Sequence, residues 1–337
     1  MTEFFTRYRS EIETGLRDCL TQEPGIYRMM CYHLGFEDEA GDPCCEGGGK
    51  ALRPTLCLFA CEALGGNPQT ALPAALAVEL IHNFSLIHDD IQDDDRERRH
   101  RPTVWAIWGK PQAINAGDAM HTLAVQVLLR LSQAGVEPQR VLEAIRILTR
   151  ATLEMIEGQH LDLGYEGRLG VTVNDYLDMV SRKTEALITC ALELGALLSC
   201  DDPETIRAFR RCGEHLGLAF QFRDDLLGIW GDVEHTGKPT ANDILRRKKT
   251  LPVVYALEQA TGAVREELIQ HYGGRMDQQV AHAVISILER LDAYTYVQRM
   301  AEMECQRALK ALDEVPLPSW AEREMEKLTD FLLSRER

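Results

Sequence analysis

Apolar residues recur at helical spacing along most of this chain, and that pattern constrains its fold more than any other feature. No stretch shows the alternating pattern of a half-buried strand. The breaks are short, and no linker, internal repeat or low-complexity tract divides the chain. We therefore predict an all-α protein with one domain over residues 1–337, a helical bundle around a central cavity. The main predicted helices cover residues 4–20, 51–64, 72–93, 112–133, 138–162, 172–198 and 202–230.

Composition limits the expected partners and compartment. The formal net charge is −16, which disfavours nucleic acid and anionic membranes as main partners. The ten cysteines show no disulfide framework and the start of the chain shows no signal-peptide pattern, so we expect reduced thiols in a cytoplasmic protein. We expect Cys57 and Cys61 to pack in the core and not at a subunit contact. No second cysteine pair has the spacing that would complete a zinc site. The apolar stretch near residues 186–200 is too short to cross a bilayer, so we predict no integral membrane segment.

The first of two aspartate-rich segments reads HDDIQDDDRERRHRPT, at residues 88–103. Asp89 and Asp93 are spaced i, i+4, so on a helix they share one face, where like charges repel unless a cation lies between them. An acidic helix end is often only a solvated surface. Here an apolar helix leads into the acids, and Arg98 and Arg99 follow them. This pattern favours a site where Mg²⁺ ions bridge carboxylates and phosphate oxygens.

The second segment, QFRDDLLGIWGD at residues 221–232, repeats this arrangement far along the chain. Asp224 and Asp225 lie on a predicted helix, and Gln221 lies one turn before Asp225. Three lysines follow the carboxylates, Lys238, Lys248 and Lys249. Two separate sets of carboxylates followed by cations together indicate diphosphate chemistry.

A third cationic element, GGGKALRPT at residues 47–55, precedes both acidic segments. Lys50 and Arg53 are placed on the first turn of a predicted helix. Glycines allow the backbone to approach an anion closely, and a helix N-terminus favours an anion. The spacing is not that of a P-loop. Alone, such a loop is more often a plain connector.

In combination these motifs resemble those of the trans-isoprenyl diphosphate synthases of the polyprenyl synthetase family. GKALRP resembles the family's GKxxRP element, and DDIQD with RRHRPT resembles its first aspartate-rich motif. GQHLDL, RKTEAL, QFRDD and TGKPTANDI follow in the family order, and the resemblance extends from Gly47 to Leu257. It implies an all-α bundle around a deep cavity, usually a homodimer. The implied reaction is the Mg²⁺-dependent head-to-tail condensation of isopentenyl diphosphate with an allylic diphosphate.

The resemblance also implies roles for individual residues. About three Mg²⁺ ions would bind per active site, ligated by Asp89, Asp93 and Asp224. Asp90 and Asp225 would lie in or near the layer of residues that contacts these metal ligands. The allylic diphosphate would contact Arg98, Lys183, Lys238 and Lys248. A metal-free pocket for isopentenyl diphosphate would consist of Gly49, Lys50, Arg53, His82 and Arg99. Thr184 and Gln221 would lie beside the forming carbocation, where their oxygens stabilise positive charge.

Product length in this family depends on a bulky residue four or five positions before the first aspartate. Ser85 and Phe84 hold these positions. On an ideal helical wheel Phe84 lies off the stripe that carries Asp89, so its role as a floor follows from the resemblance alone. One aromatic beside one small residue implies geranylgeranyl diphosphate as the product. Farnesyl diphosphate and a longer polyprenyl diphosphate are the alternatives.

The second motif departs from the family's DDxxD pattern, because Gly228 holds the third acidic position. Asp232 lies about 10 Å beyond Asp225 on a continuing helix, too far to replace that acid unless the helix breaks near Gly231. We expect the loss to weaken one metal site. The alternatives are an altered substrate or lost activity, as in a non-catalytic regulatory subunit of such an enzyme. A class I terpene cyclase is disfavoured, because the cationic pocket for isopentenyl diphosphate would then have no role.

Overall fold

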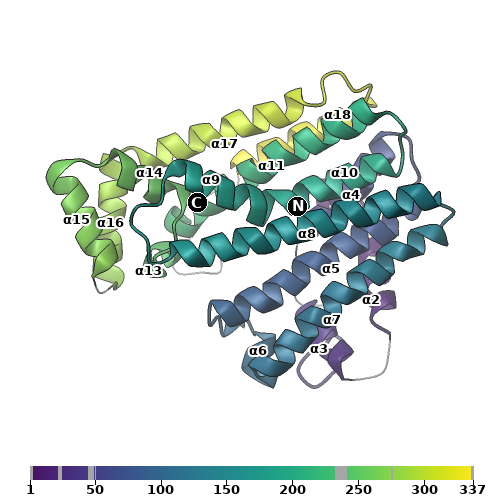
Figure 1. The fold of residues 1–337 in the computed structure, drawn as a ribbon, viewed down its shortest axis with the longest axis horizontal. Coiled ribbons are helices and arrows are strands. Elements are labelled where there is room, and N and C mark those ends of the chain that lie inside the picture. Colours follow the sequence, from purple (N-terminus) through teal and green to yellow (C-terminus); the bar gives the residue numbers. More distant parts are fainter. Residues whose placement is uncertain are drawn as a thin grey trace. The chain divides into compact units, whose positions relative to one another are not determined.

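The computed structural model of this chain describes residues 3–21, 25–44, 49, 51–231, 241–274 and 276–334. Regular structure in these ranges is almost entirely helical, which confirms the all-α prediction (Figure 1). The chain divides into two compact units. Unit 1 contains residues 1–152, 190–210 and 315–324, and unit 2 contains residues 153–189, 211–314 and 325–337. The single domain over residues 1–337 stays a prediction.

Unit 1 is built mainly from the N-terminal half of the chain. Its own elements are α1 (Glu3–Thr6), α2 (Arg9–Cys19), α3 (Ile26–His33), α4 (Leu52–Ala63), α5 (Pro68–Gln92), β1 (Glu97–Arg98), β2 (Arg101–Pro102), α6 (Val104–Trp108), α7 (Lys110–Leu128) and the 3₁₀ turn η1 (Leu129–Ser132). Four helices contribute residues to both units: α8 (Pro138–Tyr165), α10 (Ala186–Leu197), α11 (Pro203–Trp230) and α18 (Ser319–Ser334).

Helix α5 is the central element of unit 1, packed against α4 and α7. It begins four residues earlier than predicted, because Asn67 caps it by accepting a hydrogen bond from the Gln69 backbone and Pro68 fits its first position. Among the described residues, α5 is long and apolar enough to cross a membrane, but 67% of its most apolar stretch is buried in the protein. Such burial is typical of a core helix. The acidic residues of the first motif stand at its C-terminal end.

One short pair of strands lies within this all-α fold. β1 and β2 form an antiparallel pair in which Arg98 lies opposite Arg101. The two residues between the strands, Arg99 and His100, have φ values of 53° and 61°, as in a tight two-residue hairpin turn. Strands of two residues are too short for an alternating pattern to be visible in the sequence.

The helices near the N-terminus also differ from the prediction. The helix expected over residues 4–20 is divided into α1 and α2, and α3 was not predicted. Tyr8 precedes α2 as its N-cap residue, and its hydroxyl donates a hydrogen bond to Glu62 of α4. Cys57 and Cys61 are fully buried in α4, as expected for core packing.

Unit 2 contains most of the C-terminal half. Its own elements are α9 (Val173–Val180), the π-helical turn η2 (Ser181–Glu185), α13 (Asn242–Leu245), α14 (Leu251–Gln259), α15 (Gly262–Gly273), α16 (Gln278–Arg290) and α17 (Ala293–Lys310). The predicted capping box at the start of α9 is confirmed, because Thr172 and Asp175 exchange side-chain and backbone hydrogen bonds. A core of fully buried aliphatic side chains, including Val253, Val284 and Ile287, joins α14 to α16.

Candidate active site

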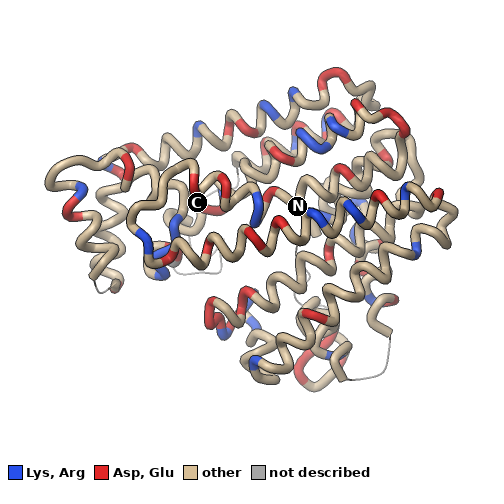
Figure 2. The backbone as a smooth tube through the Cα atoms, viewed as in Figure 1, with Lys and Arg blue, Asp and Glu red and all other residues tan. Residues whose placement is uncertain are grey.

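The first aspartate-rich motif lies where α5 ends. The helix ends at Gln92, and Asp93 keeps helical geometry, with its backbone N–H donating to the Asp89 carbonyl at 2.8 Å. Asp89 and Asp93 therefore keep their i, i+4 spacing on one face. Figure 2 shows the acidic residues gathered at this end of α5, with basic residues beside them.

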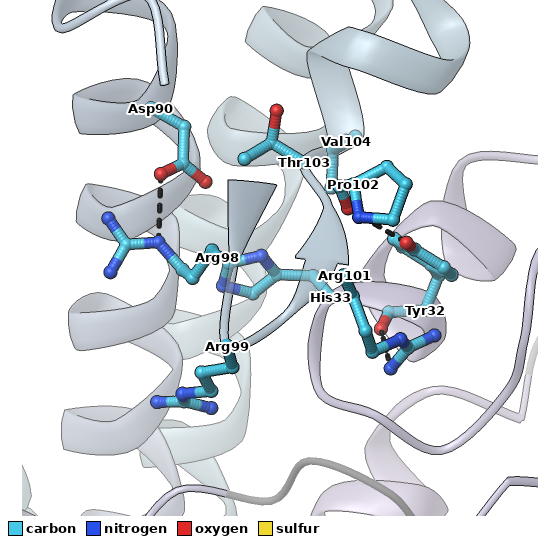
Figure 3. Close-up of a pocket in the computed structure, with 9 residues that line it drawn as sticks. All are labelled: Tyr32, His33, Asp90, Arg98, Arg99, Arg101, Pro102, Thr103 and Val104. Atoms are coloured by element: carbon cyan, nitrogen blue, oxygen red, sulfur yellow. Dashed lines mark hydrogen bonds and ion pairs between the residues drawn. The ribbon is translucent and has the colours of Figure 1, made fainter. Parts of the chain in front are cut away.

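Asp90 anchors the hairpin that carries the arginine pair. Its side chain is 1% exposed, and Arg98 Nε donates to Asp90 Oδ1 at 2.8 Å. Trp105 Nε1 donates to the Asp90 backbone oxygen, also at 2.8 Å. Burial raises the pKa of Asp90 to about 6, and the charge of Arg98 opposes this rise. Figure 3 shows the pocket beside this ion pair, which His33, Arg99 and Arg101 also line.

Four of the residues predicted to bind isopentenyl diphosphate form two contacting pairs in unit 1. Arg53 Nη1 lies 3.2 Å from His82 Nε2, so the guanidinium donates to the imidazole. Gly49 lies against Arg99, since a Cβ at residue 49 would stand 2.6 Å from Arg99 Nη2. Burial and the charges of Arg53 and Arg99 hold the pKa of His82 well below its ordinary value, so it is neutral. Lys50 lies outside the described residues.

Two buried groups beside this cationic cluster were not predicted. Glu79 is 8% exposed, and Asn83 Nδ2 donates to its Oε1 at 3.0 Å. Burial raises the pKa of Glu79, while the charge of Arg53 lowers it. Burial and the charges of Arg98 and Arg99 lower the pKa of His33 to about 3. A carboxylate in the middle of an apolar helix was the available signal for Glu79, and nothing in the sequence singled out His33.

In unit 2 the residues predicted to stabilise a carbocation form a hydrogen-bonded chain. Thr184 Oγ1 donates to Gln221 Oε1 at 2.7 Å, and Gln221 Nε2 donates to Asp225 Oδ1 at 2.8 Å. Asp225 Oδ2 accepts from the Tyr176 hydroxyl at 2.6 Å and from the Leu251 backbone N–H at 2.7 Å. Burial raises the pKa of Asp225 to about 7, against the opposing effect of these three donors.

The π-helical turn η2 presents Lys183 and Thr184. Such turns occur mostly as single bulges in α-helices, often at functional sites. Gly158 allows α8 to approach this turn, because a Cβ at residue 158 would lie 2.2 Å from the Lys183 backbone nitrogen. The Lys183 ammonium forms an ion pair with Asp162. Only a glycine at residue 158 permits this approach without displacing the turn.

One pocket in unit 2 combines carboxylates with cations. Thr184, Gln221 and Tyr176 contribute to its lining. The same pocket is lined by three aspartates and three lysines: Asp162, Asp225, Asp243, Lys183, Lys248 and Lys249. Sequence reasoning assigned no role to Asp162 or Asp243, although both lie in quoted motifs. Lys238 and Asp232 lie outside the described residues.

The donor set of both motifs suits a hard divalent cation. Within the described ranges, no three His, Cys, Asp or Glu side chains gather closely enough to hold a metal alone. Mg²⁺ in phosphate-binding enzymes is typically held by one or two carboxylates, with substrate phosphates and water completing its coordination. The residues therefore fit a metal that binds together with a diphosphate.

Phe84 and Ser85 lie one turn before the first motif. Phe84 is 6% exposed, and its ring packs edge-on against His88 and His121, with centroid distances of 5.5 and 5.1 Å. Ser85 Oγ donates to the His82 backbone oxygen at 2.8 Å. Phe84 is therefore held between α5 and α7.

Comparison with known proteins agrees with the geometry. Residues 38–288 match the family model described as polyprenyl synthetase. Geranylgeranyl diphosphate synthase of Mycobacterium tuberculosis is 44% identical over 300 residues, 87% of this chain and 83% of that protein. The (2E,6E)-farnesyl diphosphate synthase of the same organism is 40% identical over 320 residues, 93% of this chain and 87% of that protein. The crystal structure of a polyprenyl synthetase from Streptomyces coelicolor superposes with a TM-score of 0.90 at 39% identity, covering 98% of each chain.

These similarities confirm the resemblance seen in the motifs, and they extend over nearly the whole chain. The family condenses isopentenyl and allylic diphosphates and uses a divalent metal. The relatives include farnesyl and geranylgeranyl synthases at comparable identity, so they fix the class of reaction and not the product. The chain belongs to the polyprenyl synthetase family and is a prenyltransferase of the short-chain prenyl diphosphate synthase class.

Proposed function

We propose that this protein condenses isopentenyl diphosphate head-to-tail with an allylic diphosphate, requires Mg²⁺, and releases geranylgeranyl diphosphate. The observation that carries the proposal is the pocket of unit 2, where three lysines and three aspartates surround the Thr184–Gln221 pair. Lysines suit a diphosphate, carboxylates suit its metal ions, and the neutral oxygens suit a carbocation.

The allylic diphosphate must leave as an anion, so the residues around it act by taking up negative charge. The resemblance supports the proposal that the diphosphate contacts are Arg98, Lys183, Lys238 and Lys248. Asp89, Asp93 and Asp224 would hold about three Mg²⁺ ions, and these would supply positive charge to the diphosphate. Asp90 keeps Arg98 in place through its buried ion pair.

Thr184 presents a lone pair, because its hydrogen bond to Gln221 uses its hydroxyl proton. The only hydroxyl proton of Thr184 is donated to Gln221, and the amide of Gln221 donates to Asp225. Both residues line the pocket, so the Thr184 oxygen can turn only a lone pair towards it. A neutral oxygen with this orientation stabilises a passing carbocation without capturing it.

Isopentenyl diphosphate would bind to the cluster around Arg53 and Arg99. His82 is neutral there and accepts from Arg53 at its Nε2, so its other ring nitrogen carries the proton. After the new carbon–carbon bond forms, a proton must be lost. No side chain among the described residues stands out as a base, and in this proposal the released diphosphate takes that proton.

The packing of Phe84 supports a twenty-carbon product. Its ring is buried between α5 and α7 and packs against two histidine rings, so its position one turn before the first motif is fixed. The small Ser85 beside it leaves more room than a second aromatic would. These features favour geranylgeranyl over farnesyl diphosphate in this proposal.

We further propose that the protein is a homodimer. Large apolar side chains are exposed on α7, on the turn after it and on α8: Ile114 at 45%, Leu129 at 46% and Leu142 at 61%. In this proposal a second subunit covers these side chains. Light scattering coupled to size-exclusion chromatography tests this point, and a monomer mass at micromolar concentration would contradict it.

The decisive experiment incubates the purified protein with isopentenyl diphosphate, Mg²⁺ and each allylic diphosphate of five, ten or fifteen carbons. Mass analysis of the dephosphorylated products should show geranylgeraniol, and EDTA should abolish it. Farnesol or a longer prenol would correct the product length alone. The absence of any prenol, with a folded protein, would favour a non-catalytic regulatory subunit.

A further inference from the structure

Glu79 is a carboxylate in the buried, apolar part of α5. It is 8% exposed, and its neighbours Val78, Leu80 and Ile81 are fully buried. A buried carboxylate loses its hydration, which costs free energy unless opposite charges and hydrogen bonds replace the water. An apolar side chain would avoid that cost at this position. The groups around Glu79 therefore indicate what it does.

Two arginines from different segments share Glu79 as a counter-charge. Burial raises the pKa of Glu79, and the charges of Arg53 and Arg99 oppose this rise. Arg53 contacts His82, which lies one turn after Glu79 on the same face of α5. Arg99 lines one small pocket together with Glu79. The same carboxylate therefore stabilises an arginine of α4 and an arginine of the β1–β2 hairpin.

Two further buried side chains hold Glu79 in place. Asn83 is 1% exposed, and its Nδ2 donates to Glu79 Oε1 at 3.0 Å and to the Glu79 backbone oxygen at 2.8 Å. The amide oxygen of Asn83 accepts from His33 of α3. Because His33 Nε2 has no partner in the described part of the chain, the ring donates through Nδ1. His33, Asn83 and Glu79 thus form a buried hydrogen-bonded chain that leads to the two arginines.

We propose that Glu79 is a positioning residue for isopentenyl diphosphate, which orients Arg53 and Arg99 towards the diphosphate and is itself held by Asn83 and His33. The inference deepens the proposed function and rests on it. Arginine presents five N–H donors in a rigid plane, so a carboxylate at one edge of the guanidinium fixes the direction of the other donors. Without the acid, two like charges would repel each other in the empty pocket.

A mere charge-balancing role for Glu79 would have the opposite effect on binding. A carboxylate near a diphosphate repels it, so removing a simple counter-charge should strengthen binding. Removing a positioning residue should weaken binding, because the arginines must then be ordered at the moment when the substrate binds. The direction of the change in affinity therefore separates the two roles.

The effect should also be confined to one of the two substrates. Glu79 and both arginines that it contacts electrostatically belong to unit 1. In the proposed function the allylic diphosphate contacts other cations, among them Lys183 and Lys248 of unit 2. A general loss of structure would instead affect the binding of both substrates.

Steady-state kinetics with each substrate varied in turn test the inference. Glu79→Gln keeps the size of the side chain and removes its charge. It should raise the KM for isopentenyl diphosphate about tenfold and leave the KM for the allylic diphosphate within about twofold of the wild type.

Glu193→Gln is the matched control. Glu193 lies on α10 in unit 1, is 7% exposed, and accepts from Arg150 Nη2 at 2.7 Å. It is thus a second buried acid of unit 1 that pairs with an arginine. Its replacement should leave both KM values within about twofold of the wild type.

A second variant acts on the group that holds Glu79. Asn83→Ala removes the amide and leaves the acid, and should raise the KM for isopentenyl diphosphate about threefold with the same selectivity. If Glu79→Gln does not fold, Asn83→Ala decides by the same comparison. An unchanged or lower KM for isopentenyl diphosphate would overturn the inference, as would an equal rise for both substrates.

These outcomes separate the inference from the proposed function. If the wild type makes prenyl diphosphates and Glu79→Gln has the same KM for isopentenyl diphosphate, only the inference fails. If the wild type makes no prenyl product from any primer, the proposed function fails, and the inference about isopentenyl diphosphate fails with it.

Discussion

His33 should make the stability of this protein depend on pH, and the size of the effect follows from its surroundings. Its Nε2 is buried without a hydrogen-bond partner among the described residues, and Asn83 hydrogen-bonds the ring. Burial and the charges of Arg98 and Arg99 lower its pKa to about 3 in the folded protein. In the unfolded chain the pKa returns to its ordinary value of about 6.5.

The sign follows from proton binding. Because the folded pKa lies below the unfolded one, the unfolded chain takes up the proton first as the pH falls. Stability that is fully present above pH ~6.5 is therefore lost towards pH ~3, at about 1.4 kcal/mol per pH unit. Between pH 7.5 and pH 5.0 the loss due to His33 should be about 2 kcal/mol.

Urea denaturation at these two pH values measures the loss. His33→Asn keeps a polar group beside Asn83 and cannot be protonated, so its free energy of unfolding should fall about 2 kcal/mol less between pH 7.5 and pH 5.0 than that of the wild type. His282→Asn, at an exposed position of α16, should follow the wild type. An equal fall in the wild type and His33→Asn would show that His33 is not held neutral by its surroundings.

The remaining predictions concern the reaction and its supporting contacts. Asp89→Ala should lower turnover by about two to four orders of magnitude, because it removes a predicted metal ligand, and activity within tenfold of the wild type would refute that role. Phe84→Ala should lengthen the product seen by mass analysis of the prenols, and an unchanged length would remove Phe84 as the floor. Tyr176→Phe deletes a donor to buried Asp225 and should destabilise the fold by about 1–3 kcal/mol in urea. An unchanged unfolding midpoint would contradict that hydrogen bond.

The sequence predicted the long helices well, because each buries a continuous apolar face with a period near 3.6 residues. Helix α11 begins at Pro203 and ends at Trp230, as expected from the Asp202–Pro203 start signal and the Gly231 break. The i, i+4 pairs within the motifs also follow from helical geometry. The spacing from Gln221 to Asp225 was predicted, and the hydrogen bond between them confirms it.

Features that depend on contacts between distant segments could not be predicted. The hairpin around Arg99 is held by Asp90 of the preceding helix, and its strands are too short to leave a pattern. The place of Asp243 beside Gly228 depends on a contact between two separate segments of the chain, which no local period encodes. The lowered pKa of His33 arises only when α3 packs near the β1–β2 hairpin, because the charges of Arg98 and Arg99 are then close to the ring.

The π-helical turn between α9 and α10 determines the directions in which the side chains of α10 point. One extra residue in a helix rotates all later side chains by about 100°. Val180 before the turn and Leu187 after it are both buried, at 1% exposure each, while Lys183 and Thr184 line the pocket between them. Without the extra residue, the side chains of α10 would be rotated by about 100° relative to those of α9. Deleting any one residue of this turn would therefore either move Lys183 and Thr184 away from the pocket or rotate the apolar face of α10 out of the core.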